Sequence, residues 1–123
     1  MNKFLNNLLL AGLLIVPTFI IFLLSDQVNW FADPVDKMSN SQKINYFSKI
    51  LKENPTDIDA LLNRGRIYYL IQEPGNALDD LDKAIGIDPE NDHAYYLRAL
   101  ARLSVLDNTG AKEDLQQALE LNP

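Results

Sequence analysis

The chain has 123 residues, room for one small domain, and it contains no cysteine, which excludes disulfides, thiolate metal sites and cysteine nucleophiles. Its 11 lysines and arginines are outnumbered by 17 aspartates and glutamates, for a net charge of −6. Because an acidic surface repels phosphate groups, this balance argues against a nucleic-acid partner and against a protein that lies flat on anionic lipid.

The first segment, residues 4–25, contains no charged residue. Twenty-one helical residues span about 31 Å, the thickness of a hydrocarbon core, so we predict a single transmembrane anchor over this segment. A cleaved secretory signal is the alternative. It is disfavoured because the apolar stretch is longer than a usual signal core and no small-x-small cleavage site follows it.

Membrane orientation depends on basic residues near the two ends of the anchor. Lys3 and the terminal amine lie on one side, and Lys37 and Lys43 lie on the other. The two sides are nearly balanced. We favour a basic N-terminus that stays inside, which makes the protein single-pass with its remaining domain on the translocated side.

Residues 26–40 are mostly polar, show no sustained periodicity and indicate a linker. Ser39 and Gln42 have the spacing of a capping box, which predicts a helix over 41–54. That helix ends before Pro55, because the residue preceding a proline is pushed out of the α region. One face of the helix is apolar, through Ile44, Phe47, Ile50 and Leu51.

Beyond this helix the sequence repeats itself at a fixed interval. Pro55, Pro89 and Pro123 are evenly spaced along the chain. Six more pairs share the same spacing: Ala60 and Ala94, Arg64 and Arg98, Ala77 and Ala111, Asp80 and Asp114, Leu81 and Leu115, and Ala84 and Ala118. A period of about 34 residues with two amphipathic helices resembles the tetratricopeptide repeat.

The family pattern is Trp-x2-Leu-Gly-x2-Tyr, then Ala-x3-Phe, then Pro. Residues 58–91 match it with Leu61-x2-Arg64-Gly65-x2-Tyr68, Ala77-x3-Leu81 and Pro89. Residues 92–123 match it with Tyr95-x2-Arg98-Ala99-x2-Arg102, Ala111-x3-Leu115 and Pro123. The resemblance implies an all-α fold, in which two helical hairpins and one preceding capping helix lie behind the single transmembrane helix.

Small residues and turn residues are placed as such hairpins require. The small residues expected at close helix contacts are Gly65, Ala77, Ala84, Ala99, Ala111 and Ala118. Pro74-Gly75 and residues 108–110 are expected to break the chain within each hairpin, and residues 88–91 between the hairpins.

In this family the first helix of each hairpin lines a concave groove that binds protein segments. Mapped onto this chain, the partner-binding residues are Leu62, Asn63, Arg66, Tyr69, Leu70, Tyr96, Leu97, Leu100 and Leu103. Tyrosine, leucine and one arginine suit a peptide or helix with one polar anchor. Together with the predicted anchor, the resemblance therefore implies a membrane-tethered interaction adaptor or assembly factor. The alternative is a structural subunit packed permanently inside a larger membrane complex.

Polar residues that could suggest chemistry have simpler interpretations. His93 is the only histidine and is expected to be an exposed residue near a helix start. Asp79, Asp80 and Asp82 point in different directions on a helix, which indicates a solvated outer face. We therefore predict no catalytic site, no metal and no cofactor, and hence no enzyme. The arginines at 64 and 98 are expected to pair with an acid of an adjacent helix rather than with a bound carboxylate.

The last helix carries Leu115, Ala118, Leu119 and Leu121, more apolar surface than one neighbouring hairpin can cover. We predict that it packs against another chain. That chain is either the protein partner or a second copy in a two-fold homodimer.

Overall fold

The computed structural model describes residues 34–123. The predicted anchor over 4–25 and the first part of the linker lie outside these residues. The chain divides into two compact units, residues 1–37 and 38–123. In the first unit the described part is a short 3-10 helix, η1 (Pro34–Lys37). Among residues 34–123, no helix has both the length and the apolar character needed to cross a membrane.

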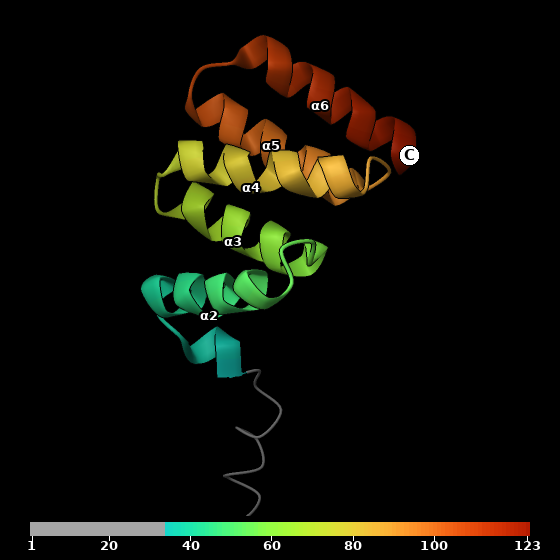
Figure 1. Ribbon diagram of the computed structural model, residues 1–123. Coiled ribbons are helices and arrows are strands. Elements are labelled where there is room, and N and C mark those ends of the chain that lie inside the picture. Colours follow the sequence, from blue (N-terminus) through green and yellow to red (C-terminus); the bar gives the residue numbers. More distant parts are fainter. Residues whose placement is uncertain (1–33) are drawn as a thin grey trace, which may run out of the picture. The chain divides into compact units, whose positions relative to one another are not determined.

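The second unit is a stack of five α-helices, which confirms the all-α expectation for residues 38–123 (Figure 1). They are α2 (Asn40–Glu53), α3 (Ile58–Leu70), α4 (Pro74–Ile87), α5 (Asp92–Ser104) and α6 (Asn108–Leu121). Each helix packs against the next one in the chain, and α3 also contacts α5. Thus α3–α4 and α5–α6 form two hairpins, and α2 covers the first hairpin.

Helices α2, α3, α5 and α6 begin at polar residues whose side chains accept hydrogen bonds from unpaired backbone N–H groups, whereas Glu73 before α4 makes no such bond. The capping box before α2 is formed as predicted. The Ser39 N–H donates to Gln42 Oε1 at 2.9 Å, and the Gln42 N–H donates to Ser39 Oγ at 3.3 Å. The caps of α3 and α5, Asp57 and Asn91, occupy the same position of successive repeats and accept from the N–H groups of Ala60 and Ala94.

The turns inside the hairpins lie earlier than we expected. Pro74 and Asn108 are the first residues of α4 and α6, so they start helices rather than break them. Proline fits there because the first turn of a helix needs no N–H donor from it. The chain instead reverses at Gln72 and Leu106, whose φ values are 62° and 63°.

Both reversals are left-handed C-caps of the Schellman type. After α3, the Glu73 N–H donates to the Tyr68 carbonyl at 2.8 Å, and the Gln72 N–H donates to the Tyr69 carbonyl at 3.1 Å. The α5–α6 turn shows the same pattern one repeat later. Glycine, the usual residue at a left-handed position, does not mark these turns in the sequence, because a glutamine and a leucine take that position.

The small residues let the helices approach closely. Ala84 is fully buried, and a Cβ added at Gly65 would lie only 3.1 Å from Leu81 Cγ. The largest fully buried side chains are Leu61 and Leu81. Ala118 differs from the other predicted small residues, because it remains half-buried. The core therefore ends before the outer face of α6.

Candidate functional site

Two arginines on the first helices of the hairpins form buried polar contacts. The Arg64 guanidinium donates through Nε and NH2 to both carboxylate oxygens of Asp80, each at 2.7 Å, and through NH1 to Ser48 Oγ at 2.8 Å. The hydrogen bond to Asp80 raises the pKa of Arg64, while burial opposes the rise. The arginine thus connects α2, α3 and α4, which confirms the predicted pairing with an acid of an adjacent helix.

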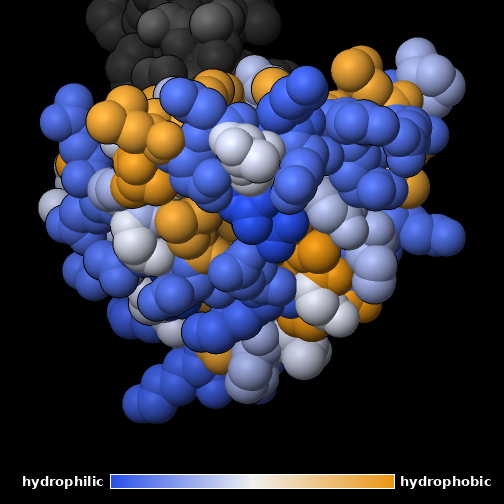
Figure 2. Space-filling view, turned by 90° about the horizontal axis from the view of Figure 1, so that it is seen from above, coloured by the Kyte–Doolittle hydropathy of each residue, from blue (hydrophilic) through white to orange (hydrophobic). Residues whose placement is uncertain are grey.

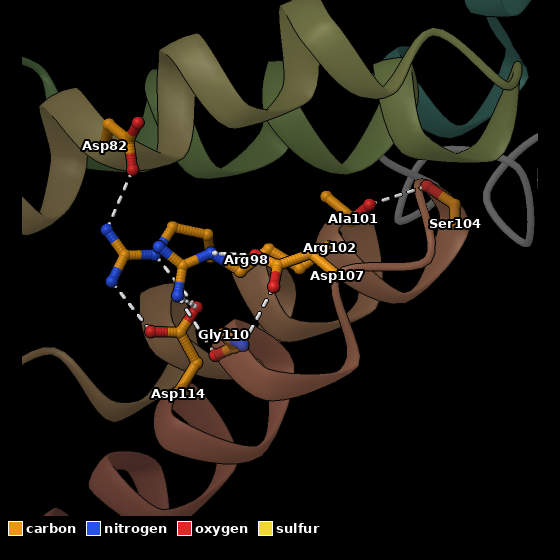
Figure 3. Close-up of polar contacts among 8 residues, drawn as sticks. All are labelled: Asp82, Arg98, Ala101, Arg102, Ser104, Asp107, Gly110 and Asp114. Atoms are coloured by element: carbon orange, nitrogen blue, oxygen red, sulfur yellow. Dashed lines mark hydrogen bonds and ion pairs between the residues drawn. The ribbon is translucent and has the colours of Figure 1, made fainter.

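Arg98 makes the equivalent contacts one repeat later (Figure 3). It donates to the two carboxylate oxygens of Asp114 at 2.9 and 2.7 Å and to Asp82 Oδ1 at 2.8 Å. Asp82 and Ser48 are equivalent in the repeat register, so each arginine contacts the same position of the preceding helix. The hydrogen bond to Asp114 raises the pKa of Arg98 against the effect of burial, with a further contribution from Asp82.

These contacts correct the interpretation of the acidic run on α4. Asp80 is only 2% exposed and accepts two hydrogen bonds from Arg64, so it belongs to the interior rather than to a solvated face. Asp79 and Asp82 are not buried in this way, but the Asp82 carboxylate is bonded to Arg98. The aspartates at 80 and 82 stabilise the hairpin stack, since an arginine–carboxylate pair fixes the relative orientation of two helices.

Arg102 adds a second cation to the α5–α6 hairpin, at the position of a family tyrosine. Its NH1 group lies 3.0 Å from the Gly110 carbonyl and 3.0 Å from Asp114 Oδ2 (Figure 3). Asp114 therefore pairs with two arginines, whereas Asp80 pairs with one. A Cβ at Gly110 would lie 2.9 Å from Asp107 Cγ and 3.0 Å from Arg102 NH1, so a larger residue here would displace these two side chains.

The structure distributes the predicted partner-binding residues over several environments. Leu62 and Leu97 are 8% and 4% exposed and belong to the hydrophobic core between the hairpins. Asn63 is half-buried, and its side-chain amide donates to the Asp59 carbonyl at 2.8 Å. Arg66 is exposed. The two buried leucines are therefore not available to a partner at the surface.

Of the other predicted residues, Tyr69 and Leu70 at the end of α3 line a first hollow of about 590 Å³. We call it the turn-side hollow, and its lining residues are Tyr69, Leu70, Gln72, Pro74 and Ser104. Leu70 is 60% exposed, and Leu103, which precedes Ser104 on α5, is 43% exposed. A surface of this kind combines an aromatic ring and exposed aliphatic groups with a few polar atoms, as protein-binding surfaces do.

A second hollow of about 390 Å³ lies between the start of α5 and the end of α6. Its lining residues are Asp92, His93, Tyr96, Leu115, Ala118, Leu119 and Asn122. Tyr96 is 46% exposed and stacks on His93, with ring centroids 6.3 Å apart. The structure therefore places Tyr96 beside the apolar residues of the last helix, away from the turn-side hollow.

Comparison with known protein families decides the classification. The sequence model of the tetratricopeptide repeat matches residues 58–91 and 92–123, which is more than half of the chain. The chain belongs to the tetratricopeptide repeat family.

Solved structures of similar proteins agree with this classification. The first tetratricopeptide domain of Spaghetti (RPAP3), bound to the HSP90 peptide SRMEEVD, is 26% identical and superposes with a TM-score of 0.64. That match covers 65% of this chain and 64% of the other. The crystal structure of MamA is 30% identical with a TM-score of 0.64, covering 75% of this chain and 56% of MamA. This chain thus spans less than two thirds of either protein.

A curated relative is similar over a shorter stretch. The UDP-N-acetylglucosamine–peptide N-acetylglucosaminyltransferase of Giardia intestinalis is 31% identical over 71 residues. The matched stretch is 56% of this tetratricopeptide repeat protein but only 5% of the transferase.

Two features of this tetratricopeptide repeat protein were missed from the sequence. One is the burial of Asp80 and Asp114, although their pairing with Arg64 and Arg98 could have been found, because both types of residue recur in the same repeat register. The other is the position of Tyr96. The equivalent residue one repeat earlier is Leu62, which is buried where α5 packs against the first hairpin. The repeat register therefore places Tyr96 on the face of its hairpin that packs against a following helix.

Proposed function

We propose that this protein is a membrane-tethered protein–protein interaction adaptor or assembly factor that binds a peptide or helix of its partner at the turn-side hollow. The observation that carries the proposal is the half-buried Tyr69 and the exposed Leu70 beside Ser104, on two repeats of a family whose RPAP3 member is bound to a peptide. Burial of such aromatic and aliphatic side chains supplies most of the binding energy at protein interfaces.

The chemistry of the surface favours an apolar partner segment. Among the nine residues predicted to bind the partner, Arg66 is the only charged one, and the chain as a whole carries a net charge of −6. A peptide as acidic as the SRMEEVD bound by RPAP3 would meet a repulsive field and few cations. The proposed partner segment therefore carries leucine-like anchors and one acidic residue that meets Arg66.

The proposed tether is the uncharged segment over 4–25, which is long enough to span a membrane. We place the repeats on the translocated side, and we propose no catalytic activity for the chain itself. Retention of the anchor is tested by the intact mass of protein extracted from membranes. Orientation is tested by protease treatment of sealed vesicles. A mature N-terminus beyond Ser25 would contradict the tether.

The binding proposal is tested by crosslinking the full-length protein in cells and identifying the attached chains. Tyr69→Ala is expected to reduce recovery of the specific partner about tenfold. Tyr46→Ala is the matched control, because Tyr46 is a 41% exposed tyrosine on α2, outside the hollow. Far-UV circular dichroism must show that both variants remain helical. Equal partner recovery by the two variants would remove the turn-side hollow from the binding site.

The alternative is a permanent structural subunit, which the apolar residues exposed on α6 favour, since Leu119 is 67% exposed. A permanent subunit is expected to be unstable when it is produced without its complex. An adaptor is expected to fold alone with a cooperative thermal transition. Differential scanning calorimetry of the purified full-length protein separates the two.

A further inference from the structure

The first hairpin shows what covers the outer face of a repeat in this protein. Helix α5 packs against α4 and also contacts α3. The face beneath it is closed, because Leu62 is 8% exposed and Leu81 and Ala84 are fully buried. Helix α5 fits closely because its own buried residues include Ala94, Leu97 and Ala101, two of which are small.

The equivalent face of the second hairpin, one repeat later, is open. We call it the end face and define it by Tyr96, Leu115, Ala118 and Leu119, which line one hollow. Tyr96 is 46% exposed where its counterpart Leu62 is 8% exposed, and Leu119 is 67% exposed. Figure 2 looks onto the α6 end of the unit, where orange patches interrupt the largely hydrophilic surface. No helix within residues 34–123 covers the end face.

We propose that the end face binds one amphipathic α-helix of a partner protein, and that this helix has the chemistry of α5. The facing side of the bound helix carries small and apolar residues at the spacing of Ala94, Leu97 and Ala101. This pattern is required because the end face has the same repeat register as the face of the first hairpin that α5 covers. A bulkier stripe would hold the bound helix away from Ala118, as a large residue at position 94 would separate α5 from α4.

The bound helix also carries a basic residue next to its apolar stripe. In the hairpin stack, Arg98 of α5 reaches back to Asp82 of α4 at 2.8 Å. The position equivalent to Asp82 on α6 is Gln116, whose side chain donates to Glu120 Oε1 at 3.1 Å in an exposed contact. The amide oxygen of Gln116 and the carboxylate of Glu120 are acceptors for an arginine or lysine of the partner.

The charges on α6 favour a different protein, rather than a second copy of this chain, as the partner at the end face. Asp114 is buried and paired with Arg98 and Arg102, so the exposed charges of α6 are Glu113 and Glu120 against one basic residue, Lys112. A two-fold dimer through the end face would bring two such acidic helices together, which is unfavourable. The helix of a second copy that has the required pattern, α5, is already packed within its own stack. The inference adds a second surface to the proposed function, and it is independent of binding at the turn-side hollow.

The test uses a synthetic peptide with the sequence of residues 90–105, which is α5 with its cap, as the probe. Its binding to the purified full-length protein is followed by isothermal titration calorimetry. We expect saturable binding, and Leu119→Glu is expected to weaken it about tenfold or more. Leu106→Glu is the matched control, because Leu106 is 82% exposed and does not line the end face. It is expected to leave the affinity unchanged.

A second measurement covers the case of a peptide that is poorly helical by itself. Residues 90–105 are duplicated directly after Pro123 in the full-length chain, which preserves the repeat register. The duplication is expected to raise the thermal midpoint, and Leu119→Glu is expected to abolish the rise. The proposal is overturned if neither the peptide nor the duplication has an effect, or if Leu106→Glu acts as strongly as Leu119→Glu. It is also overturned if sedimentation shows a dimer that Leu119→Glu dissociates, because the face then belongs to a second copy.

Discussion

The first hairpin, α3–α4, and the second, α5–α6, have equivalent residues in different surroundings. Helices α2 and α5 cover the first hairpin on both sides, whereas within residues 34–123 the second hairpin is covered only on the side of α4. Ala84 is consequently fully buried, while Ala118 is half-buried. The repeat motif determines which residues face outward from a hairpin, and the neighbouring helix determines whether they form core.

The first hairpin has more apolar cover, but the second hairpin has more ion pairs. In the first, Arg64 joins Asp80 and the neutral Ser48. In the second, Asp114 pairs with both Arg98 and Arg102, and Arg98 also reaches Asp82. The hairpin with less apolar cover thus has more ion pairs, so removal of a charge should affect the second hairpin more than the first.

The largest expected effect tests that difference. Asp114→Asn should destabilise the protein by about 3 kcal/mol, because it leaves two arginine groups without their buried carboxylate. Asp80→Asn, which affects one arginine, should cost less. Asp79→Asn is the control, an aspartate of α4 outside the buried core, and should change stability by less than about 0.5 kcal/mol. Urea denaturation measures all three. Equal losses for Asp80 and Asp114 would show that the second arginine contributes nothing.

The arginines themselves should not make stability depend on pH near neutrality. Hydrogen bonds to Asp114 and Asp80 raise the pKa values of Arg98 and Arg64 above the ordinary value of an arginine. A raised pKa contributes stability that is complete at any pH below the ordinary arginine value, far above neutrality, and is lost only as pH rises through the raised pKa. The difference between Asp114→Asn and Asp80→Asn should therefore be the same at pH 7 and pH 9.

A smaller effect is expected from bulk added at the two equivalent alanines. Ala84→Leu should cost about 1–3 kcal/mol, because the site is fully buried against α5. Ala118→Leu should change stability by less than about 0.5 kcal/mol, because its face is partly open. Thermal denaturation of the full-length variants compares the two. If Ala118→Leu is as damaging as Ala84→Leu, the end face of the isolated protein is already covered.

Much of this architecture could be predicted from the repeat register and the apolar periodicity. The helices, the capping box at Ser39 and the small residues at close contacts follow from local sequence patterns, and the structure contains all three. The sequence patterns do not show which residues of other helices each side chain contacts. Leu62 and Leu97 lie on the helices that line the groove in this family, yet contacts between hairpins bury them. An aspartate is usually exposed, and Asp80 was misplaced because its burial depends on Arg64, which lies on another helix.

The smallest expected effect concerns the two left-handed turns, which are equivalent in backbone but not in surroundings. Gln72 and Leu106 have φ near 60°, where a side chain costs about 1 kcal/mol relative to glycine. Leu106 is 82% exposed, so Leu106→Gly loses little packing and should stabilise the protein by about 0.5–1 kcal/mol.

Gln72→Gly should give a similar gain, since Gln72 is also exposed, but it removes one wall of the turn-side hollow. We therefore expect it to weaken partner recovery, whereas Leu106→Gly should leave recovery intact. Chemical denaturation gives the stabilities, and the crosslinking experiment gives the recoveries. A loss of stability in Leu106→Gly would mean that the exposed leucine makes a contact in solution. Equal partner recovery by the two glycine variants would show that the partner does not touch Gln72.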